Sequence, residues 1–210
     1  MTHFGIRHWN RNLLTLVALL PTAGALGAGW NEAVDGDLSG NYQSPTVINL
    51  VPGVNTIRAT SASTPTFDLE YFQLNLPAQS QIDAIILREY DQGYDTTFIG
   101  VQQGAGFTFP ANDAFTNIGS LLGWAHFGDD PLDLGVGDDL LPVIGTGGGA
   151  VGFSGPLTGS TYTFWAQQQS STPTTYALEF VVSSAVPEPT TLAGVIAALL
   201  VGACGRRIRR

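Results

Sequence analysis

Lysine is absent from this 210-residue chain, and all eight of its basic residues are arginine. Charged residues make up only 12% of the chain, about half the share typical of globular proteins. The single cysteine, Cys204, lies in the last apolar run, so residues 29–184 hold neither a disulfide nor a cysteine-based metal site. A domain of that size has a core large enough to fold without a disulfide.

Positive charge is also scarce in the middle of the chain. Only Arg58 and Arg88 lie within residues 29–184, which hold 16 of the 17 acidic residues and carry a formal net charge of −14. Clustered lysine and arginine bind nucleic-acid phosphates, so no nucleic-acid partner is predicted for this acidic region. Its charge is compatible with cation binding or with solubility alone.

No apolar run reaches the roughly 20 residues typical of a transmembrane helix. The first run, residues 13–20, follows a cationic segment and precedes small residues, with candidate cleavage sites that end at Ala25 and Ala28. This order is typical of a secretory signal peptide, which we assign to residues 1–28 and expect signal peptidase to remove. The alternative is a buried N-terminal helix.

The second apolar run, residues 192–204, lies between two further signals. A Pro-Glu-Pro tripeptide precedes it and a cluster of arginines follows it: Pro187, Glu188 and Pro189, then Arg206, Arg207, Arg209 and Arg210. The prolines stop a helix from continuing back into the domain, and the terminal positive charge favours retention of that end in the cytoplasm. By its length alone, the run is a marginal membrane helix.

The tripeptide, the apolar run and the basic end together resemble the PEP-CTERM sorting signal of Gram-negative bacteria, over residues 185–210. The resemblance implies that a membrane enzyme called exosortase recognises and processes the tail. It also implies a link to exopolysaccharide and biofilm. We therefore expect an exported, non-enzymatic protein of the cell envelope, outer surface or extracellular matrix that is transiently anchored in the inner membrane. The alternative is a plain C-terminal membrane anchor.

Hydrophobic residues between the two ends alternate with a period of two. The pattern is clearest at residues 72–76, 162–166 and 176–182, and glycine and proline separate the apolar segments. We predict an all-β domain over residues 29–184, an antiparallel, jelly-roll-like β-sandwich, with a signal helix before it and a hydrophobic helix after it. Residues 68–74, 82–87 and 159–164 resemble the bacterial pre-peptidase C-terminal type of β-sandwich, which implies an accessory domain without its own protease.

Oxygen-bearing side chains recur at every second position in one early loop: Asp35, Asp37, Ser39 and Asn41. Calcium prefers several oxygen ligands on a tight, glycine-containing loop, so this loop is a candidate calcium site. No glutamate stands at the twelfth position, which is Thr46. The alternative is a polar turn whose side chains bond to their own backbone.

Other acidic residues are predicted to lie in loops. We interpret one group as a solvated loop face, with cation binding as the alternative: Asp129, Asp130, Asp133, Asp138 and Asp139. A short helical turn is predicted at residues 138–144 with Asp138 as its cap. Asp91 and Asp95 are expected to flank the tip of a β-hairpin.

Aromatic residues are the remaining candidates for ligand contact. Five of them can stack on sugar rings or pack as core: Trp30, Trp124, Trp165, Tyr90 and Tyr94. Trp165 lies on the strand face opposite Tyr162 and Phe164, so one of these two sets is expected to be exposed. His126 lacks partners for a zinc site or a triad, and Ser154 lacks a nucleophile elbow, so a secreted hydrolase is the weaker alternative.

Overall fold

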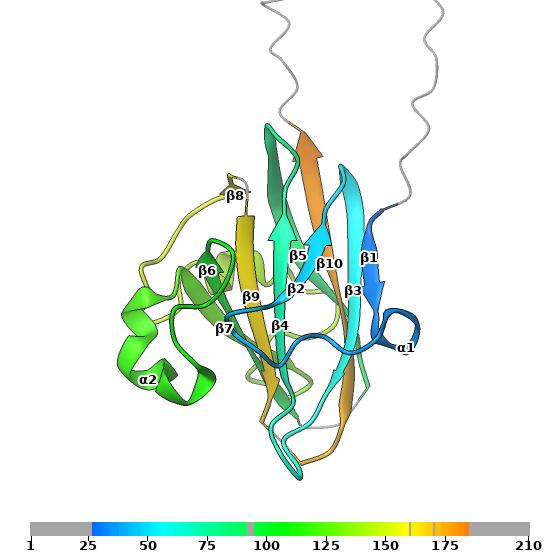
Figure 1. The fold of residues 1–210 in the computed structure, drawn as a ribbon, viewed down its shortest axis with the longest axis vertical. Helices are drawn as coiled ribbons and strands as arrows, with labels where there is room; N and C mark the ends of the chain where they lie inside the picture. The colour runs from blue at the N-terminus through cyan, green and yellow to red at the C-terminus, as the bar shows by residue number, and fades with distance from the viewer. Residues whose placement is uncertain (1–26, 92–94, 160, 170, 185–210) are drawn as a thin grey trace, which may run out of the picture.

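Two five-stranded sheets pack face to face in the chain (Figure 1). A computed structural model describes residues 27–91, 95–159, 161–169 and 171–184. The first sheet, called sheet A here, has the strand order β1 (Gly29–Asn31), β3 (Gly53–Ser61), β10 (Thr174–Ser184), β5 (Ser80–Tyr90) and β8 (Leu157–Thr158). The second sheet, called sheet B, has the order β2 (Thr46–Asn49), β4 (Leu69–Asn75), β9 (Thr161–Gln168), β6 (Thr96–Gln103) and β7 (Gly123–Gly128). The predicted all-β sandwich is confirmed at this level.

Helices in the described residues are single turns. They are α1 (Glu32–Asp35), η1 (Ala111–Asp113), α2 (Ala114–Asn117), η2 (Ile118–Ser120) and α3 (Leu141–Ile144). Within these ranges, no helix combines the length and apolar character needed to cross a membrane. The predicted signal helix, the Pro187–Glu188–Pro189 motif, the C-terminal apolar run and the terminal arginines lie outside the described residues.

Two strand pairs depart from the predicted antiparallel arrangement. β1 pairs with β3 in parallel, and β2 pairs with β4 in parallel, while the other pairs are antiparallel. Parallel neighbours need a long crossover rather than a tight turn, and in each pair the connection passes through the other sheet. The turn at Pro52 and Gly53 makes one of these crossings, because it leads from β2 in sheet B to β3 in sheet A.

The predicted hairpin at Asp91 and Asp95 is wrong. β5 belongs to sheet A and β6 to sheet B, so the segment between them crosses from one sheet to the other. Asp91 accepts a hydrogen bond from the Thr175 amide, which fixes the start of this crossing. Residues 92–94, including Tyr94, lie outside the described residues.

The core lies between the two sheets and follows the predicted alternation. On β4, Phe72 and Leu74 are fully buried, and Phe72 stacks on Phe164 of β9 with ring centroids 5.5 Å apart. Phe180 of the facing strand β10 packs edge-on against both rings. Because adjacent strand residues point to opposite faces, every second residue of β4 and β9 reaches this interior.

The short helix near residue 140 differs from its prediction. It begins at Leu141 rather than Asp138, and Asp139, not Asp138, accepts the hydrogen bond from the Leu141 amide. The same Asp139 oxygen also accepts from the Ile85 amide of β5. The turn is therefore positioned by its attachment to sheet A, which the local sequence pattern does not contain.

The outer face of sheet B is covered around Trp165, so the aromatic residues on both faces of β9 are buried. Trp165 is 4% exposed although it lies opposite Tyr162 and Phe164, which are buried in the core. Its partners form a second cluster of Tyr71, Phe107, Phe109 and Leu121. The expectation that one side of β9 faces solvent is wrong, because the connection between β6 and β7 folds back over it.

Candidate functional site

Aromatic side chains occupy two adjacent rows on the outer face of sheet B. Reading across β7, β6 and β9, the register places His126, Phe98 and Gln167 in one row, and Trp124, Gly100 and Trp165 in the next. A Cβ at Gly100 would come within 3.0 Å of the Phe98 ring. Without that atom, Phe98 lies against Trp165, with ring centroids 4.6 Å apart.

The connection between β6 and β7 covers part of this face (Figure 1). Gln102 of β6 holds it: the side-chain amide donates to the Ser120 carbonyl at 2.7 Å, and its oxygen accepts from the Thr108 amide at 3.0 Å. Beneath this cover, Phe107 packs edge-on against Trp165. Phe115 of α2 projects outward and is 96% exposed.

A pocket of about 530 Å³ remains where the cover ends. Phe98, Trp124 and Trp165 form its apolar floor, and the exposed rings of Phe67 and Phe115 stand at its rim. No Asp, Glu, Lys or Arg is among the described residues that line it. This volume and an apolar lining are typical of sites for small ligands.

Polar groups border one side of the pocket floor. His126 lies edge-on to Trp124, with ring centroids 5.5 Å apart, and its Nε2 is 3.2 Å from the side-chain amide nitrogen Nε2 of Gln169. Gln167 lines the same side, and its side-chain amide has no hydrogen-bond partner within the ranges that the structure describes. The pocket therefore offers hydrogen-bonding amide and imidazole groups beside stacked rings.

The floor is rigidly built. Trp124 Nε1 donates to the Gly148 carbonyl at 3.0 Å, which fixes the indole orientation. A Cβ at Gly147 would lie 2.6 Å from the Trp124 carbonyl oxygen, so glycine is required for this close approach. A ligand therefore meets a pre-formed surface rather than one that must order on binding.

The structure separates the five aromatic residues predicted from the sequence. Trp124 and Trp165 meet at the pocket, whereas Trp30 lies on the edge strand β1 and donates its Nε1 proton to the Gly36 carbonyl at 2.9 Å. Tyr90 packs edge-on against Phe127 of the core, and Tyr94 is outside the described residues. The sequence reasoning missed Phe98, Phe115 and Gln167, and the short apolar segment at residues 98–101 was the available signal for Phe98.

The predicted calcium loop is mostly occupied by its own backbone. Asp35 accepts from the Asn31 amide, Ser39 donates to the Ser44 carbonyl and accepts from the Asn41 amide, and Asn41 accepts from the Gln43 amide. Asp37 differs from these three residues. Its carboxylate lies within 4.8 Å of carboxylate oxygens of Glu32 and Glu70, which sequence reasoning did not select.

The second acidic group builds loops rather than one cluster. Each member accepts a hydrogen bond from a neighbouring residue: Asp129 from the Asp95 amide, Asp130 from the Leu132 amide, Asp133 from the Thr96 hydroxyl, Asp138 from the Gly135 amide, and Asp139 from the Ile85 and Leu141 amides. Asp130 and Asp138 bond within their own turns, as expected for aspartate in loops, whereas Asp129, Asp133 and Asp139 also bind these loops to residues of distant segments.

His126 and Ser154 form no hydrolytic arrangement in the parts of the chain that the structure describes. His126 has rings and an amide around it, and it belongs to no group of three potential metal ligands there. Ser154 lies on an exposed loop segment outside any strand-to-helix turn. No protein-family model, curated protein or solved structure matches the chain.

Proposed function

We propose that this chain is an exported, non-enzymatic protein of the cell surface or extracellular matrix, whose β-sandwich binds a neutral saccharide in the aromatic pocket. The observation that carries the saccharide proposal is the uncharged pocket itself, in a region whose formal charge is −14. A charged ligand would call for a charged partner in the lining. An uncharged ligand with apolar and hydroxyl faces matches rings bordered by amides.

Sugar rings combine the two surfaces that the pocket presents. The C–H face of a pyranose stacks on an indole or phenyl ring, and its hydroxyl groups exchange hydrogen bonds with amide and imidazole groups. Trp124 and Phe98 supply stacked rings 6.1 Å apart, and Gln167 supplies a donor and an acceptor at their side. The resemblance of the C-terminal tail to a sorting signal linked to exopolysaccharide makes exopolysaccharide the proposed source of these sugars.

The export proposal rests on the two ends of the sequence. Residues 1–28 act as the signal peptide that signal peptidase removes. Residues 185–210 act as the sorting segment that exosortase processes, with the apolar run as a membrane helix before processing. The pre-peptidase resemblance supports a jelly-roll-like sandwich, since residues 69–74 of one resembling segment lie in β4 and residues 161–164 of another lie in β9.

The pocket is tested by titrating the full chain, purified in mild detergent, with exopolysaccharide fragments from the producing organism in a calorimeter. Trp124→Leu is expected to weaken binding about tenfold or more, which corresponds to about 1.4 kcal/mol. Trp30→Leu is the matched control, since Trp30 also donates its indole proton to a glycine carbonyl but lies far from the pocket. Absence of binding by the wild type, or equal losses in both variants, overturns the saccharide proposal.

The sorting proposal has a separate test in cells. Deletion of residues 186–210 is expected to release the protein into the medium, because the segment that exosortase processes is gone. Immunoblots of the cell and medium fractions measure the change. A deletion that leaves the location unchanged contradicts sorting by the tail.

A further inference from the structure

A carboxylate lies in the apolar interior of the sandwich. Glu70 of β4 has the same strand parity as Phe72 and Leu74, so its side chain points between the two sheets. It is 0% exposed, and neither of its carboxylate oxygens meets a hydrogen-bond donor of the described residues; the carboxyl group of Glu32 lies within hydrogen-bonding reach and pairs with it only through a shared proton. A buried charge without a partner is costly, so this group calls for a neutralising ligand or a proton.

Two further carboxylates are brought to Glu70 by the N-terminal segment. The parallel pairing of β1 with β3 carries α1 beside sheet A, and the Glu32 carboxylate accepts from the Leu38 amide at 3.0 Å and the Thr60 amide at 2.6 Å. These bonds hold the loop after α1, which contains Asp37. Carboxylate oxygens of Glu32, Asp37 and Glu70 then lie within 4.8 Å of one another.

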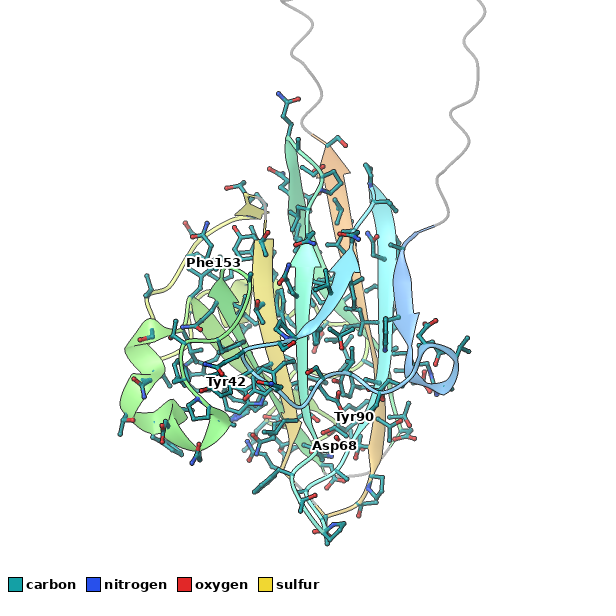
Figure 2. All side chains as sticks on the ribbon, in the orientation of Figure 1. Tyr42, Asp68, Tyr90 and Phe153 are labelled. Carbon is teal, nitrogen blue, oxygen red and sulfur yellow. The ribbon has the colours of Figure 1, made fainter. Side chains whose placement is uncertain are left out.

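Negative charge accumulates around these three groups. Burial, then the charge of Glu32 and then the charge of Asp68 raise the pKa of Glu70 to about 10. Figure 2 shows Asp68 at the end of the sandwich remote from the chain ends. The Tyr176 hydroxyl of β10 is also fully buried without a hydrogen-bond partner in the described part. Burial, and after it the charge of Glu70, raises the pKa of Tyr176 well above its ordinary value.

Positive side chains are absent from this site in the described chain. Arg58 pairs with Glu89 at 2.8 Å and Arg88 pairs with Glu179 at 2.5 Å, and these are the two arginines of residues 27–184. Elsewhere, then, arginine neutralises acidic groups of the sheet, but no arginine remains for Glu32, Asp37 and Glu70. The described side chains therefore leave these three carboxylates without a positively charged partner.

We propose that Glu32, Asp37 and Glu70 bind one divalent cation, and that this cation is Ca²⁺. Carboxylate oxygens are the ligands that hard cations prefer. Calcium binds oxygen at about 2.3–2.6 Å, so two oxygens on one ion lie no more than about 5.2 Å apart. The carboxylate oxygens of these three residues all lie within 4.8 Å of one another, which is compatible with one shared ion. Exposed Asp37 provides the entry side, and buried Glu70 provides the inner ligand.

A bound ion at this site would link separate parts of the fold, which a ligand in the saccharide pocket would not. The ion joins β4 of sheet B to α1, which follows the edge strand β1 of sheet A and is bonded to β3 through Glu32, and to the loop after α1. Calcium binding would therefore tie the first segment of the domain to both sheets. The pocket on the outer face of sheet B shares none of these three residues.

The test uses the full chain in mild detergent, freed of metal with EDTA and then titrated with Ca²⁺ by calorimetry and with Tb³⁺ by tyrosine-sensitised luminescence. Asp37→Asn and Glu70→Gln are each expected to weaken Ca²⁺ binding about tenfold or more. Asp35→Asn is the matched control, because Asp35 lies two residues from Asp37 but bonds to the Asn31 amide instead. Its Ca²⁺ affinity is expected to stay within about twofold of the wild type.

Three results would overturn the cation site. The first is a wild-type chain that shows no saturable Ca²⁺ binding, which would leave Glu70 neutralised by a proton alone. The second is an Asp37→Asn chain, folded by circular dichroism, that binds as tightly as the wild type. The third is an Asp35→Asn chain that loses as much affinity as Asp37→Asn. Trp124→Leu separates the two proposals, since it should weaken saccharide binding and leave Ca²⁺ binding unchanged.

Discussion

Glu70 and Tyr71 are neighbours on β4, yet they belong to two sites of opposite chemistry. Glu70 points into the interior and meets carboxylates, whereas Tyr71 points outward and stacks on Trp165 with ring centroids 6.0 Å apart. Interiors of sandwiches are normally apolar and their outer faces polar. Around these two residues the interior contains carboxylates and the outer face contains aromatic rings. Each departure from the normal pattern coincides with a candidate binding site.

The difference between the two sites lies in what completes them. The aromatic face is covered by the chain itself, apart from the opening of the pocket. The acidic group is left with unpartnered oxygens and no basic side chain in the described ranges. The aromatic pocket is thus pre-formed, whereas the proposed cation site would be completed by an ion from solution.

Removal of Trp165 should have the largest effect, because this ring joins the sheet to its cover. We expect Trp165→Ala to lower the free energy of unfolding by about 3–5 kcal/mol, as for other buried tryptophans. Urea denaturation measures it, with Gln167→Ala, two residues further along the same strand face, expected to stay within about 0.5 kcal/mol of the wild type. A loss from Trp165→Ala as small as that of the control would mean that the outer face is not packed.

A smaller loss of unfolding free energy is expected at Gly100, because the Phe98 ring occupies the space that a side chain at this position would need. Gly100→Ala places a Cβ 3.0 Å from the Phe98 ring and should cost about 1–3 kcal/mol by displacing it. Saccharide affinity should fall with it, since Phe98 forms the pocket floor. Gly148→Ala is the control, because a Cβ there meets no atom within 4 Å. Equal unfolding free energies for the two variants would contradict a sterically fixed floor.

The acidic site predicts a pH dependence of the metal-free protein. Burial and then the charge of Glu32 raise the pKa of Glu70 from 4.5 to about 10. The folded chain therefore keeps a proton that the unfolded chain releases above about pH 4.5, so stability is fully present below that pH and is lost as the pH rises towards about 10. Melting temperatures in EDTA across this range measure the loss.

Glu70→Gln is the control for that pH series. It has no carboxyl group at this position, so its melting temperature should fall less steeply than that of the wild type between about pH 5 and pH 9. Added Ca²⁺ should restore the wild-type melting temperature at the upper end of the range and have little effect on the variant. Parallel pH profiles for the two chains would exclude Glu70 as the titrating group.

The smallest effect is expected at a carboxylate that already has its partner. Glu89 is paired with Arg58 at the surface, where it is bound through two oxygens at 2.8 Å. Exposed pairs of this kind contribute about 0–1 kcal/mol, so Glu89→Gln should change the unfolding free energy by no more than that and leave Ca²⁺ binding unaltered. A larger change would show that overall acidity, rather than the missing partner at Glu70, controls stability.

The strands themselves were predictable because their hydrophobic period is local. Residues 72–76 and 176–182 alternate visibly, and the structure buries the expected side of each. The sheet to which a strand belongs is not determined by its local sequence. Residues 46–49 and 53–61 are separated by a short turn and would be expected to pair, yet β2 and β3 lie in different sheets. The parallel edge pairs and the crossing after β5 depend on such sheet changes, which the period of two does not encode.

The two sites were predictable in part for the same reason. Asp37 was found because oxygen-bearing residues recur in its loop, but Glu70 lies within an apolar strand and meets Asp37 only after β4 takes its place in sheet B. Trp124 and Trp165 were found from their residue type. Their meeting depends on a register in which Gly100 separates them, and that register is set by three strands from distant parts of the sequence.

Both ends of the domain leave sheet A on the same side. β1 is parallel to β3 and β10 is antiparallel to it, so the start of β1 and the end of β10 point to the same end of the sandwich, opposite the loop before β4 (Figure 1). A chain tethered by its tail holds both binding sites at the far end. A force on a bound ligand would then act along β10, parallel to its neighbours β3 and β5. The hydrogen bonds on both edges of β10 would share this shear force, instead of breaking one at a time.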